Sequence, residues 1–401
     1  MNIVVVSPFL LGDSPDSGGG VSALGFLKSL APRHNLYVIA FDQRIDPDES
    51  ERSIREMEAW ATSVRVVYLP ITFLRKLCAK LLQLLLIPHV ATLHSTATFR
   101  QACKETLAKY QIDLAIVQFP QMAQYVEEFQ TIPRIMDVED AYSVSSFRNY
   151  AAADLLPLPN RFYAALKWLG WVRHERRYYN KVDHVFVVSE QDDYGLRVFS
   201  PNLRTTVLRR MMPPLCDSIA STDPVFDIGF IGSFDHEPNV KSLNFLFEDV
   251  LPQLVKQMPD LRVLVAGKNP PKKLVDRAPA FVKFVGFVPQ VEDFYRQVRI
   301  VVAPLITGGG VKIKVIEGLR SGRSVVTTSI GAEGLGVTNG VNALIADGPL
   351  DFVAAIVKLS NNEDYRAAIG SAGQKHALTL TPAALHSEMV DEVFKSVYRT
   401  S

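Results

Sequence analysis

Cysteine is scarce in this sequence, and the arrangement of the few that occur excludes two classes of site. The 401 residues contain only Cys78, Cys103 and Cys216, which lie far apart and are odd in number. No Cys-x-x-Cys pair occurs, so neither a zinc site nor a disulfide framework is predicted. A reducing, cytoplasmic compartment fits this cysteine content best.

Long apolar runs and an excess of one charge are also missing. No stretch reaches the roughly 18 apolar residues that span a bilayer, and the N-terminus lacks the basic region of a secretory signal. Lys and Arg number 43 and Asp and Glu 42, giving a net charge of +1. This balance argues against a nucleic-acid partner. We expect a chain that is soluble, or peripheral to a membrane at most.

What the sequence does contain is an alternation of short β-branched runs with helical patterns, which is typical of parallel α/β sheets. The expected strands of the first half are 2–7, 36–41, 64–68, 113–117, 133–137 and 183–188. Those of the second half are 226–231, 261–266, 281–285, 300–303, 324–328 and 343–345. The predicted fold class is therefore α/β, with two Rossmann-like parallel-sheet domains facing a cleft.

A proline-rich break separates the two halves. We interpret 213–225, with its Pro-Pro pair and small polar residues, as a hinge. It divides an N-terminal Rossmann-like domain at 1–212 from a C-terminal one at 226–380. Residues 381–401 have a helical pattern. That helix either crosses back to the N-terminal domain or is the last helix of the second sheet.

The most informative segment follows the expected strand 300–303. Gly308–Gly310 lie between that strand and a helix that we expect to begin near Val311. Glycines before a helix N-terminus let the backbone approach an anion closely. Lys312 and Lys314 oppose the helix dipole unless an anion lies between them, and a diphosphate would suit both. A flexible glycine loop is the alternative.

Glu317 lies three residues after Lys314, on a similar face of the expected helix. A carboxylate beside a diphosphate site would accept hydrogen bonds from two ribose hydroxyls. An intrahelical ion pair with Lys314 is the alternative. The segment is not a P-loop, because the Gly-Lys-Ser/Thr ending is absent.

The order of these elements resembles the GT-B-fold nucleotide-sugar glycosyltransferases of family 4, the "glycosyl transferases group 1" type. In that group a Pro-Leu pair, a Gly-rich loop, basic residues, Lys-x-x-Glu and a Gly-x-x-Val-Val strand follow one another. Here these elements read Pro304-Leu305, Gly308–Gly310, Lys312, Lys314, Glu317 and Gly322–Val326. The stretch 330–335 resembles a subgroup that builds surface polysaccharides and lipid-linked glycans.

The resemblance implies that the C-terminal domain binds the donor and the N-terminal domain the acceptor. The donor-binding residues it implies are Gly19, Gly20, Gly232, Ser233, Gly286, Val288, Gly308, Gly309, Gly310, Lys312, Lys314 and Glu317. Lys312 and Lys314 would hold the diphosphate and act in catalysis. Glu317 would hold the ribose, and main-chain atoms near Gly286 and Val288 the base.

Three positions depart from the family pattern. Gly309 stands where many members have a Glu that contacts the donor sugar. Ser233 replaces the usual Arg after the glycine that opens the second domain, and Asn239 replaces a downstream Lys. One phosphate contact is therefore missing from its usual place or comes from elsewhere.

In the N-terminal half, two segments at strand ends carry candidate residues. Gly18–Gly20 precede an expected helix at 21–30, where they would face the donor phosphate; a mobile surface loop is the alternative. Asp137 and Asp140 follow the strand 133–136, where function concentrates in open α/β sheets. We expect both to be catalytic residues that contact the acceptor or the transferred sugar, while an N-cap role is the alternative for Asp140.

Two further segments indicate contact with lipid. Residues 73–87 have basic side chains on one side and leucines on the other, as in a helix at a lipid interface. Residues 161–181 combine Trp168, Trp171, Tyr178 and Tyr179 with arginines, which suits a headgroup region. An ordinary packed helix is the alternative for each.

We therefore predict a retaining, metal-independent glycosyltransferase of the hexosyltransferase type. It needs no cofactor and uses a nucleotide-diphosphate sugar of the UDP or GDP type as donor substrate. The acceptor is a glycan, a lipid-linked molecule or a small molecule. Two other functions stay open: a nucleotide-sugar epimerase on the same fold, and a non-catalytic assembly partner in a glycan pathway.

Overall fold

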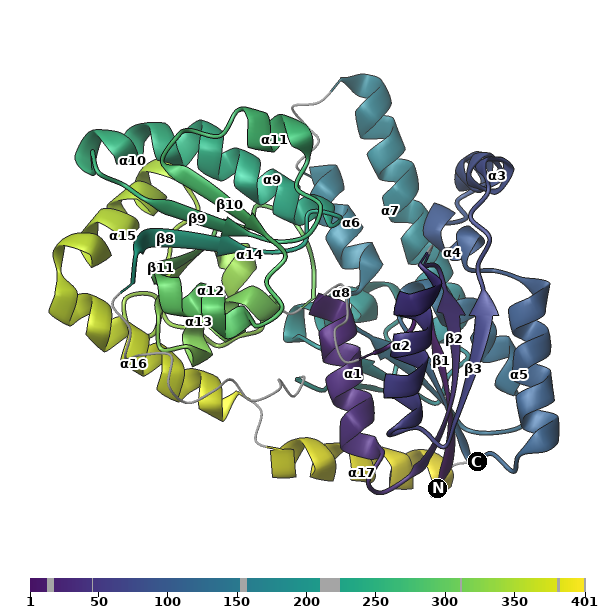
Figure 1. The fold of residues 1–401 in the computed structure, drawn as a ribbon. Helices are drawn as coiled ribbons and strands as arrows, with labels where there is room; N and C mark the ends of the chain where they lie inside the picture. The colour runs from purple at the N-terminus through teal and green to yellow at the C-terminus, as the bar shows by residue number, and fades with distance from the viewer. Residues whose placement is uncertain are drawn as a thin grey trace. The chain divides into compact units, whose positions relative to one another are not determined.

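The computed structural model describes residues 1–12, 18–44, 46–151, 157–209, 224–310, 312–380 and 383–399. The chain divides into two compact units, Met1–Met212 with Ala383–Ser401, and Pro213–Pro382. Each unit is a parallel β-sheet covered by helices (Figure 1). The predicted α/β class with two Rossmann-like sheets is confirmed. The expected hinge at 213–225 lies outside the described residues except for its last two positions.

The first unit contains a seven-stranded sheet in the order β3-β2-β1-β4-β5-β6-β7. Its strands are β1 Asn2–Ser7, β2 Asn35–Asp42, β3 Ser63–Tyr68, β4 Leu114–Gln118, β5 Arg134–Val138, β6 His184–Val187 and β7 Thr205–Val207. Its helices are α1 Gly18–Leu30, α2 Pro47–Glu58, α3 Phe73–Gln83, α4 His89–Leu93, α5 Ala97–Lys109, the 3-10 helix η1 Pro120–Phe129, α6 Tyr142–Ala151, α7 Leu158–Tyr179, α8 Glu190–Phe199 and α17 Ala383–Arg399.

The second unit contains a six-stranded sheet in the order β10-β9-β8-β11-β12-β13. Its strands are β8 Phe226–Ile231, β9 Val263–Ala266, β10 Val282–Gly286, β11 Val298–Ala303, β12 Ser324–Thr327 and β13 Leu344–Ile345. Its helices are α9 Glu237–Phe245, the π-helical turn η4 Leu246–Val250, α10 Leu251–Gln257, α11 Lys272–Asp276, α12 Val291–Gln297, α13 Ile313–Arg320, α14 Ser329–Ala332, α15 Pro349–Asn361 and α16 Glu363–Thr379.

The central strands are apolar throughout because helices cover both faces of each sheet. In β1, Val4 and Val6 pack into the core on one face of the sheet, and Ile3 and Val5 pack into the core on the other. This split follows the alternation of side chains along a strand. A continuous run of valines and isoleucines therefore fills two separate cores.

The terminal helix α17 completes a core of the first unit. Val390, Val393 and Phe394 pack in the same cluster as Ile3 and Val5. Arg33 and Asp391 add an ion pair of 2.5 Å between the end of α1 and this helix. The last residues of the chain thus pack with the first strand, although the whole second unit lies between them in sequence.

Both sheets reverse their strand order at one point, between β1 and β4 in the first and between β8 and β11 in the second. In open α/β sheets, ligands bind beyond the carboxyl ends of the strands at this reversal, because the following helices turn their N-termini toward it. The loops after β8 and β11 are therefore the places in the second unit where the fold itself favours an anion.

Candidate functional site

The loops after β8 and β11 meet at the switch point of the second sheet. Residues 232–236 join β8 to α9, and residues 304–312 join β11 to α13. A Cβ added to Gly308 would lie 3.5 Å from Pro238, in the first turn of α9. The glycine-rich loop and the start of α9 are thus neighbours, as the N-terminal regions of two helices at one strand edge should be.

Lys314 reaches across this junction from the first turn of α13. Its ammonium donates a hydrogen bond to Oδ1 of Asn239 on α9, and it lies 4.6 Å from the ring centroid of Phe230 on β8. Asn239 in turn donates to the carbonyl of Ser233 at 2.6 Å. Asn239, which stands where the resembling family has a lysine, therefore connects Lys314 to the loop after β8.

The pKa of Lys314 is lowered to about 7, mainly by burial; the charge of Glu317 acts to raise it and that of Lys312 to lower it. One amide oxygen and an aromatic ring compensate poorly for the free energy that a charged lysine loses when it leaves water. An anion placed beside it would supply the missing charge and raise that pKa. The site is therefore electrostatically incomplete without a negative ligand.

Lys312 occupies the N-cap position of α13, which begins at Ile313. Its side chain is only 7% exposed, and its ammonium donates to the carbonyl of Gly309 at 2.6 Å. The side chain of Lys312 thus folds back on the glycine-rich loop. In this conformation it holds the loop closed on itself, and a phosphate would have to compete with the carbonyl groups for its protons.

Glu317 does not form the intrahelical ion pair that sequence spacing allowed. Its Oε2 accepts a hydrogen bond of 3.0 Å from the hydroxyl of Tyr295 on α12, and within the described residues no ion pair joins it to Lys314. Burial raises the pKa of Glu317 to about 7, against the lowering effect of the Tyr295 hydrogen bond. Tyr295 is fully buried, so it fixes the direction of this carboxylate.

His236 is a neighbour of the two lysines that the sequence did not single out. It is the N-cap residue of α9, and its pKa is lowered by burial first and then by the charges of Lys314 and Lys312. Its position after a strand end at the switch point was the signal that could have identified it. Two lysines and a neutral histidine thus gather at the start of two helices.

Glycines bring the neighbouring strand ends together. Gly267 follows β9 with φ of +148°, and a Cβ there would lie 1.9 Å from the carbonyl oxygen of Gly232. Its amide donates to the carbonyl of Gly286 at 2.7 Å, which occupies one main-chain acceptor of the expected base site. Beyond Gly286, Val288 is half-buried, and the exposed ring of Phe287 has the ammonium of Lys268 4.6 Å from its centroid.

In the first unit, the glycine triplet forms the first turn of α1, which begins at Gly18, so the expectation of a loop before a helix at 21–30 is wrong. A Cβ on Gly19 would lie 3.1 Å from the ring of Phe119. Phe119 ends β4 at the switch point and has φ of +65°, which is strained for a non-glycine residue. Gly20 is buried within the same turn. Only a small side chain fits where α1 approaches β4.

Asp137 and Asp140 have different surroundings. Asp137 is fully buried and accepts a hydrogen bond of 3.1 Å from the side chain of Gln118, so it presents no surface to an acceptor. Asp140 is half-buried and raises the pKa of Glu175 on α7. Burial, the larger cause, brings that pKa to about 8. Glu175 in turn accepts from the amide of Ser143 in the first turn of α6 at 3.1 Å.

The described residues contain no group of three or more His, Cys, Asp or Glu side chains that could hold a metal ion. The expectation of a metal-independent, cofactor-free reaction stays a prediction. In the same ranges, no helix combines the length and the apolar character needed to cross a membrane.

Comparison with known proteins supports the geometry of the second unit. Residues 225–362 match the family model described as "Glycosyl transferases group 1". That range contains Lys312, Lys314, Glu317, Asn239 and His236. The chain has the GT-B fold, and its second unit matches the group 1 glycosyl transferases.

Among curated proteins, an "Uncharacterized 44.6 kDa protein in cps region" from Klebsiella pneumoniae is 28% identical over 142 residues. The match covers 33% of this chain and only 37% of that relative. The similarity to this relative is therefore limited to about a third of each chain.

Solved structures of GT-B enzymes match the fold over nearly the whole chain. Sucrose-phosphate synthase from Thermosynechococcus elongatus aligns with a TM-score of 0.69 and 15% identity, covering 100% of both chains. HepE from Anabaena in complex with UDP-glucose aligns with a TM-score of 0.63 and 14% identity, covering 99% of this chain and 100% of HepE. The sequence resemblance to GT-B group 1 glycosyltransferases is thus confirmed.

Proposed function

We propose that this protein is a glycosyltransferase that moves a sugar from a nucleoside-diphosphate donor to an acceptor hydroxyl. One observation carries the proposal: Lys314 is buried at the switch point of the second sheet, where burial lowers its pKa to about 7 and its ammonium donates to the neutral side chain of Asn239. Such a buried, undercompensated cation is suited to an anion that arrives with the substrate.

The donor diphosphate would lie between the start of α13 and the loop after β8. Its charge grows as the glycosidic bond breaks, and Lys314, Lys312 and the positive end of the α13 dipole would stabilise that charge. This arrangement supplies positive charge without a divalent ion. Glu317, held by Tyr295, would accept hydrogen bonds from the ribose hydroxyls.

We propose a uridine nucleotide as the first donor to test, because the similarly folded HepE was solved in complex with UDP-glucose. The base would contact main-chain atoms near Val288 and the exposed Phe287. The resemblance to the group 1 glycosyltransferases implies retention of configuration. Because no side chain of the described site is placed as a covalent nucleophile, we favour attack on the same face as the departing phosphate over a double displacement.

The acceptor is proposed to bind at the first unit, at the carboxyl ends of β4 and β5. Asp140 is the better placed of the two expected aspartates, since Asp137 is fully buried. The likeness to a Klebsiella protein "in cps region" supports an acceptor in surface polysaccharide synthesis. Cys78 and Cys103 are free thiols, which agrees with the proposed cytoplasmic location.

Product analysis tests this function. The protein is incubated with UDP-glucose, UDP-N-acetylglucosamine or GDP-mannose, each with and without a panel of sugar and lipid-linked acceptors. A new glycoside that appears only with acceptor supports the proposal. Epimerised donor without acceptor would show an epimerase. Failure to bind any nucleoside diphosphate would show the non-catalytic assembly partner that Gly309 and Ser233 leave open.

A further inference from the structure

Helix α3 presents most of its large apolar side chains to solvent, and the residues on the side that faces the protein are small or polar. Phe73 is 78% exposed, Leu74 70% and Leu85, just after the helix, 62%. The side that faces the protein carries Arg75, Ala79 and Gln83. This is the reverse of a helix that packs on a soluble core. The alternative of an ordinary core-facing helix is therefore wrong for this segment.

Specific contacts fix this orientation. Arg75 donates to the carbonyls of Leu93 at 2.8 Å and Ser95 at 3.0 Å, and the hydroxyl of Tyr163 on α7 donates to Gln83 at 3.4 Å. A helix held by an inward arginine and an inward glutamine cannot turn its leucines toward the core without losing these bonds. The apolar side chains at 73, 74, 77, 81, 84 and 85 form what we name the α3 face.

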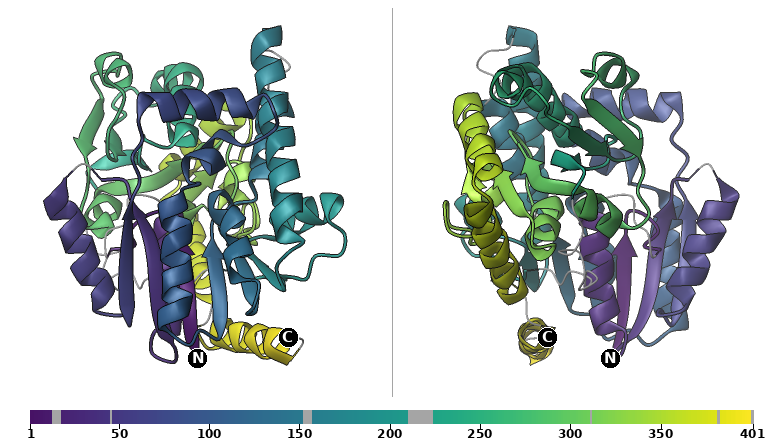
Figure 2. Two further views of the ribbon diagram at one scale, coloured as in Figure 1. Left: turned by 90° about the vertical axis from the view of Figure 1, so that its right-hand side faces the viewer. Right: turned by 60° about the vertical axis from the view of Figure 1, so that its left-hand side comes forward.

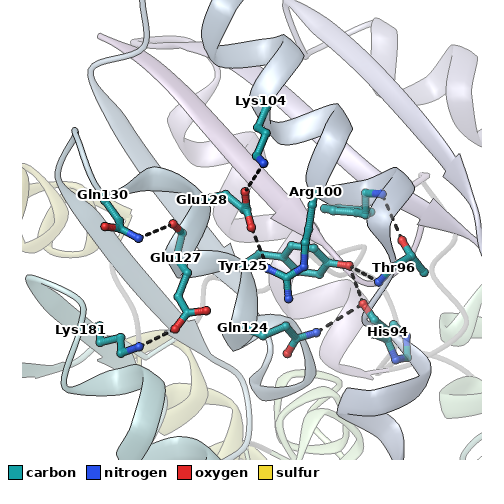
Figure 3. Close-up of polar contacts among 11 residues, drawn as sticks. His94, Thr96, Arg100, Lys104, Gln124, Tyr125, Glu127, Glu128, Gln130 and Lys181 are labelled. Atoms are coloured by element: carbon teal, nitrogen blue, oxygen red, sulfur yellow. Dashed lines mark hydrogen bonds and ion pairs between the residues drawn. The ribbon is translucent and has the colours of Figure 1, made fainter.

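The turn that receives Arg75 is itself well anchored, as Figure 3 shows. The hydroxyl of Tyr125 donates to the carbonyl of His94 at 2.7 Å and accepts from the amide of Thr96 at 3.1 Å. The side chain of Gln124 also donates to the His94 carbonyl, at 3.3 Å. The turn that Arg75 contacts is thus held to η1 by hydrogen bonds, which supports the outward direction of the α3 face.

Positive charge borders the α3 face. Lys76 and Lys80 are exposed on its flank. Together with Lys167 of α7 they lie close enough to His89 for their charges to lower its pKa, after the larger effect of burial. From residue 59 to residue 104 the sequence contains no Asp or Glu. The segment that carries the α3 face therefore attracts anions through its lysines and has no carboxylate of its own to repel them.

We infer that the α3 face docks on an anionic lipid bilayer. Leucines and phenylalanine would enter the acyl boundary while Lys76 and Lys80 contact lipid phosphates, which is how basic amphipathic helices bind membranes. In Figure 2, α3 lies beyond the carboxyl ends of the strands of the first sheet. The bilayer would thus lie on the same edge as Asp140. The inference rests on the first unit alone and is independent of the proposed donor site.

The second segment expected to touch lipid, 161–181, differs from α3. Trp171 and Tyr179 are buried in the first unit, and Trp168 stacks on Tyr150 with centroids 5.5 Å apart. Three of its aromatic rings are therefore engaged within the protein. The packed-helix alternative describes this part of α7, and we limit the proposed docking surface to α3.

Vesicle flotation of the full chain tests the inference. We expect binding to vesicles of phosphatidylcholine with phosphatidylglycerol and at least about tenfold weaker binding to phosphatidylcholine alone, because about 1 kcal/mol per basic residue is lost. The double variant Leu77→Glu/Leu81→Glu should lose binding by about tenfold or more. Leu350→Glu, which changes an equally exposed leucine (68%) of the second unit, should leave binding unchanged.

Three results would overturn the inference. The parent protein could fail to float with anionic vesicles, or the double variant could float as the parent does. Sedimentation could also show a dimer of the parent that Leu77→Glu/Leu81→Glu dissolves, which would make a second copy the occupant of the α3 face. Both variants should keep the parent's thermal unfolding temperature, since the changed side chains are exposed. The affinity of these variants for UDP, measured in the same preparations, tests the proposed donor site independently of membrane binding.

Discussion

Lys314 and Asn239 form a hydrogen bond that joins the starts of two helices in the second unit. The same asparagine holds the carbonyl of Ser233, so one amide keeps the loop after β8 and the lysine of α13 in fixed relation. In this chain a neutral side chain stands where the resembling family has a second lysine. The positive charge of the site is thus concentrated in α13 and the residue before it.

Replacement of Asn239 tests this connection. Asn239→Ala should destabilise the second unit by about 1–3 kcal/mol, because a buried ammonium and a carbonyl lose their partner. Calorimetric unfolding measures the change. Asn244→Ala, on the same helix, removes a half-buried amide that accepts a hydrogen bond from the exposed Arg277, so it should cost at most about 1 kcal/mol. In a double-mutant cycle with Lys314→Met the two effects should not be additive; additive effects would contradict the connection.

The close approach of the loops after β8 and β9 predicts a strong effect at one glycine. Gly267→Ala would place a Cβ 1.9 Å from the carbonyl oxygen of Gly232 at φ of +148°. We expect a loss of more than about 2 kcal/mol in the unfolding free energy. Gly286→Ala also requires a positive φ, of +70°, but this lies in the left-handed helical region and has open space around the Cβ. Its cost should be about 1 kcal/mol, and equal costs would contradict the steric account.

Ligand affinity should depend on pH in a defined direction. Free Lys314 has a pKa of about 7, and a bound diphosphate raises it, so above pH 7 binding takes up a proton. Affinity for UDP should therefore fall from pH 7.5 to pH 9, by at most about tenfold per unit. The terminal phosphate is already ionised in this range. Calorimetry in two buffers of different ionisation enthalpy measures the uptake, which should vanish in Lys314→Met.

Glu317 should discriminate the ribose. In the parent protein, UDP should bind at least about tenfold more tightly than its 2′,3′-dideoxy analogue, because hydrogen bonds to a charged group contribute about 1.5–3 kcal/mol. Glu317→Gln keeps the shape of the side chain and removes its charge. It should therefore weaken the binding of UDP and leave the binding of the analogue nearly unchanged. A variant that discriminates as the parent does would show that Glu317 has a structural role, in which it accepts the hydrogen bond of Tyr295.

Much of the fold follows from the sequence alone. The alternation of β-branched runs with helical patterns indicated twelve of the strands, and β1 and β8 have the expected bounds. The strand β7 was missed because Thr205–Val207 is short and only half-buried. The helical state of Gly18–Gly20 was missed because packing against Phe119 overrides the low helix propensity of glycine.

The candidate site was only partly predictable. Lys312, Lys314 and Glu317 are close in sequence, so their spacing places them near one another. The partner of Glu317 is Tyr295, on another helix, and the contact between His236 and the lysines crosses from α9 to α13. Such pairings depend on strand order, which no local pattern encodes. The outward direction of α3 depends on Arg75 reaching Leu93 and Ser95, for the same reason.

Titration calorimetry with UDP tests the central claim most directly. The account predicts that the parent protein binds UDP and that Lys314→Met binds it at least about tenfold more weakly, since a charge-assisted contact to phosphate is lost. Lys241→Met, which changes a partly exposed lysine of α9 paired with Glu237, should bind as the parent does. Equal affinity of Lys314→Met and the parent would contradict the claim that the switch point of the second sheet is the diphosphate site.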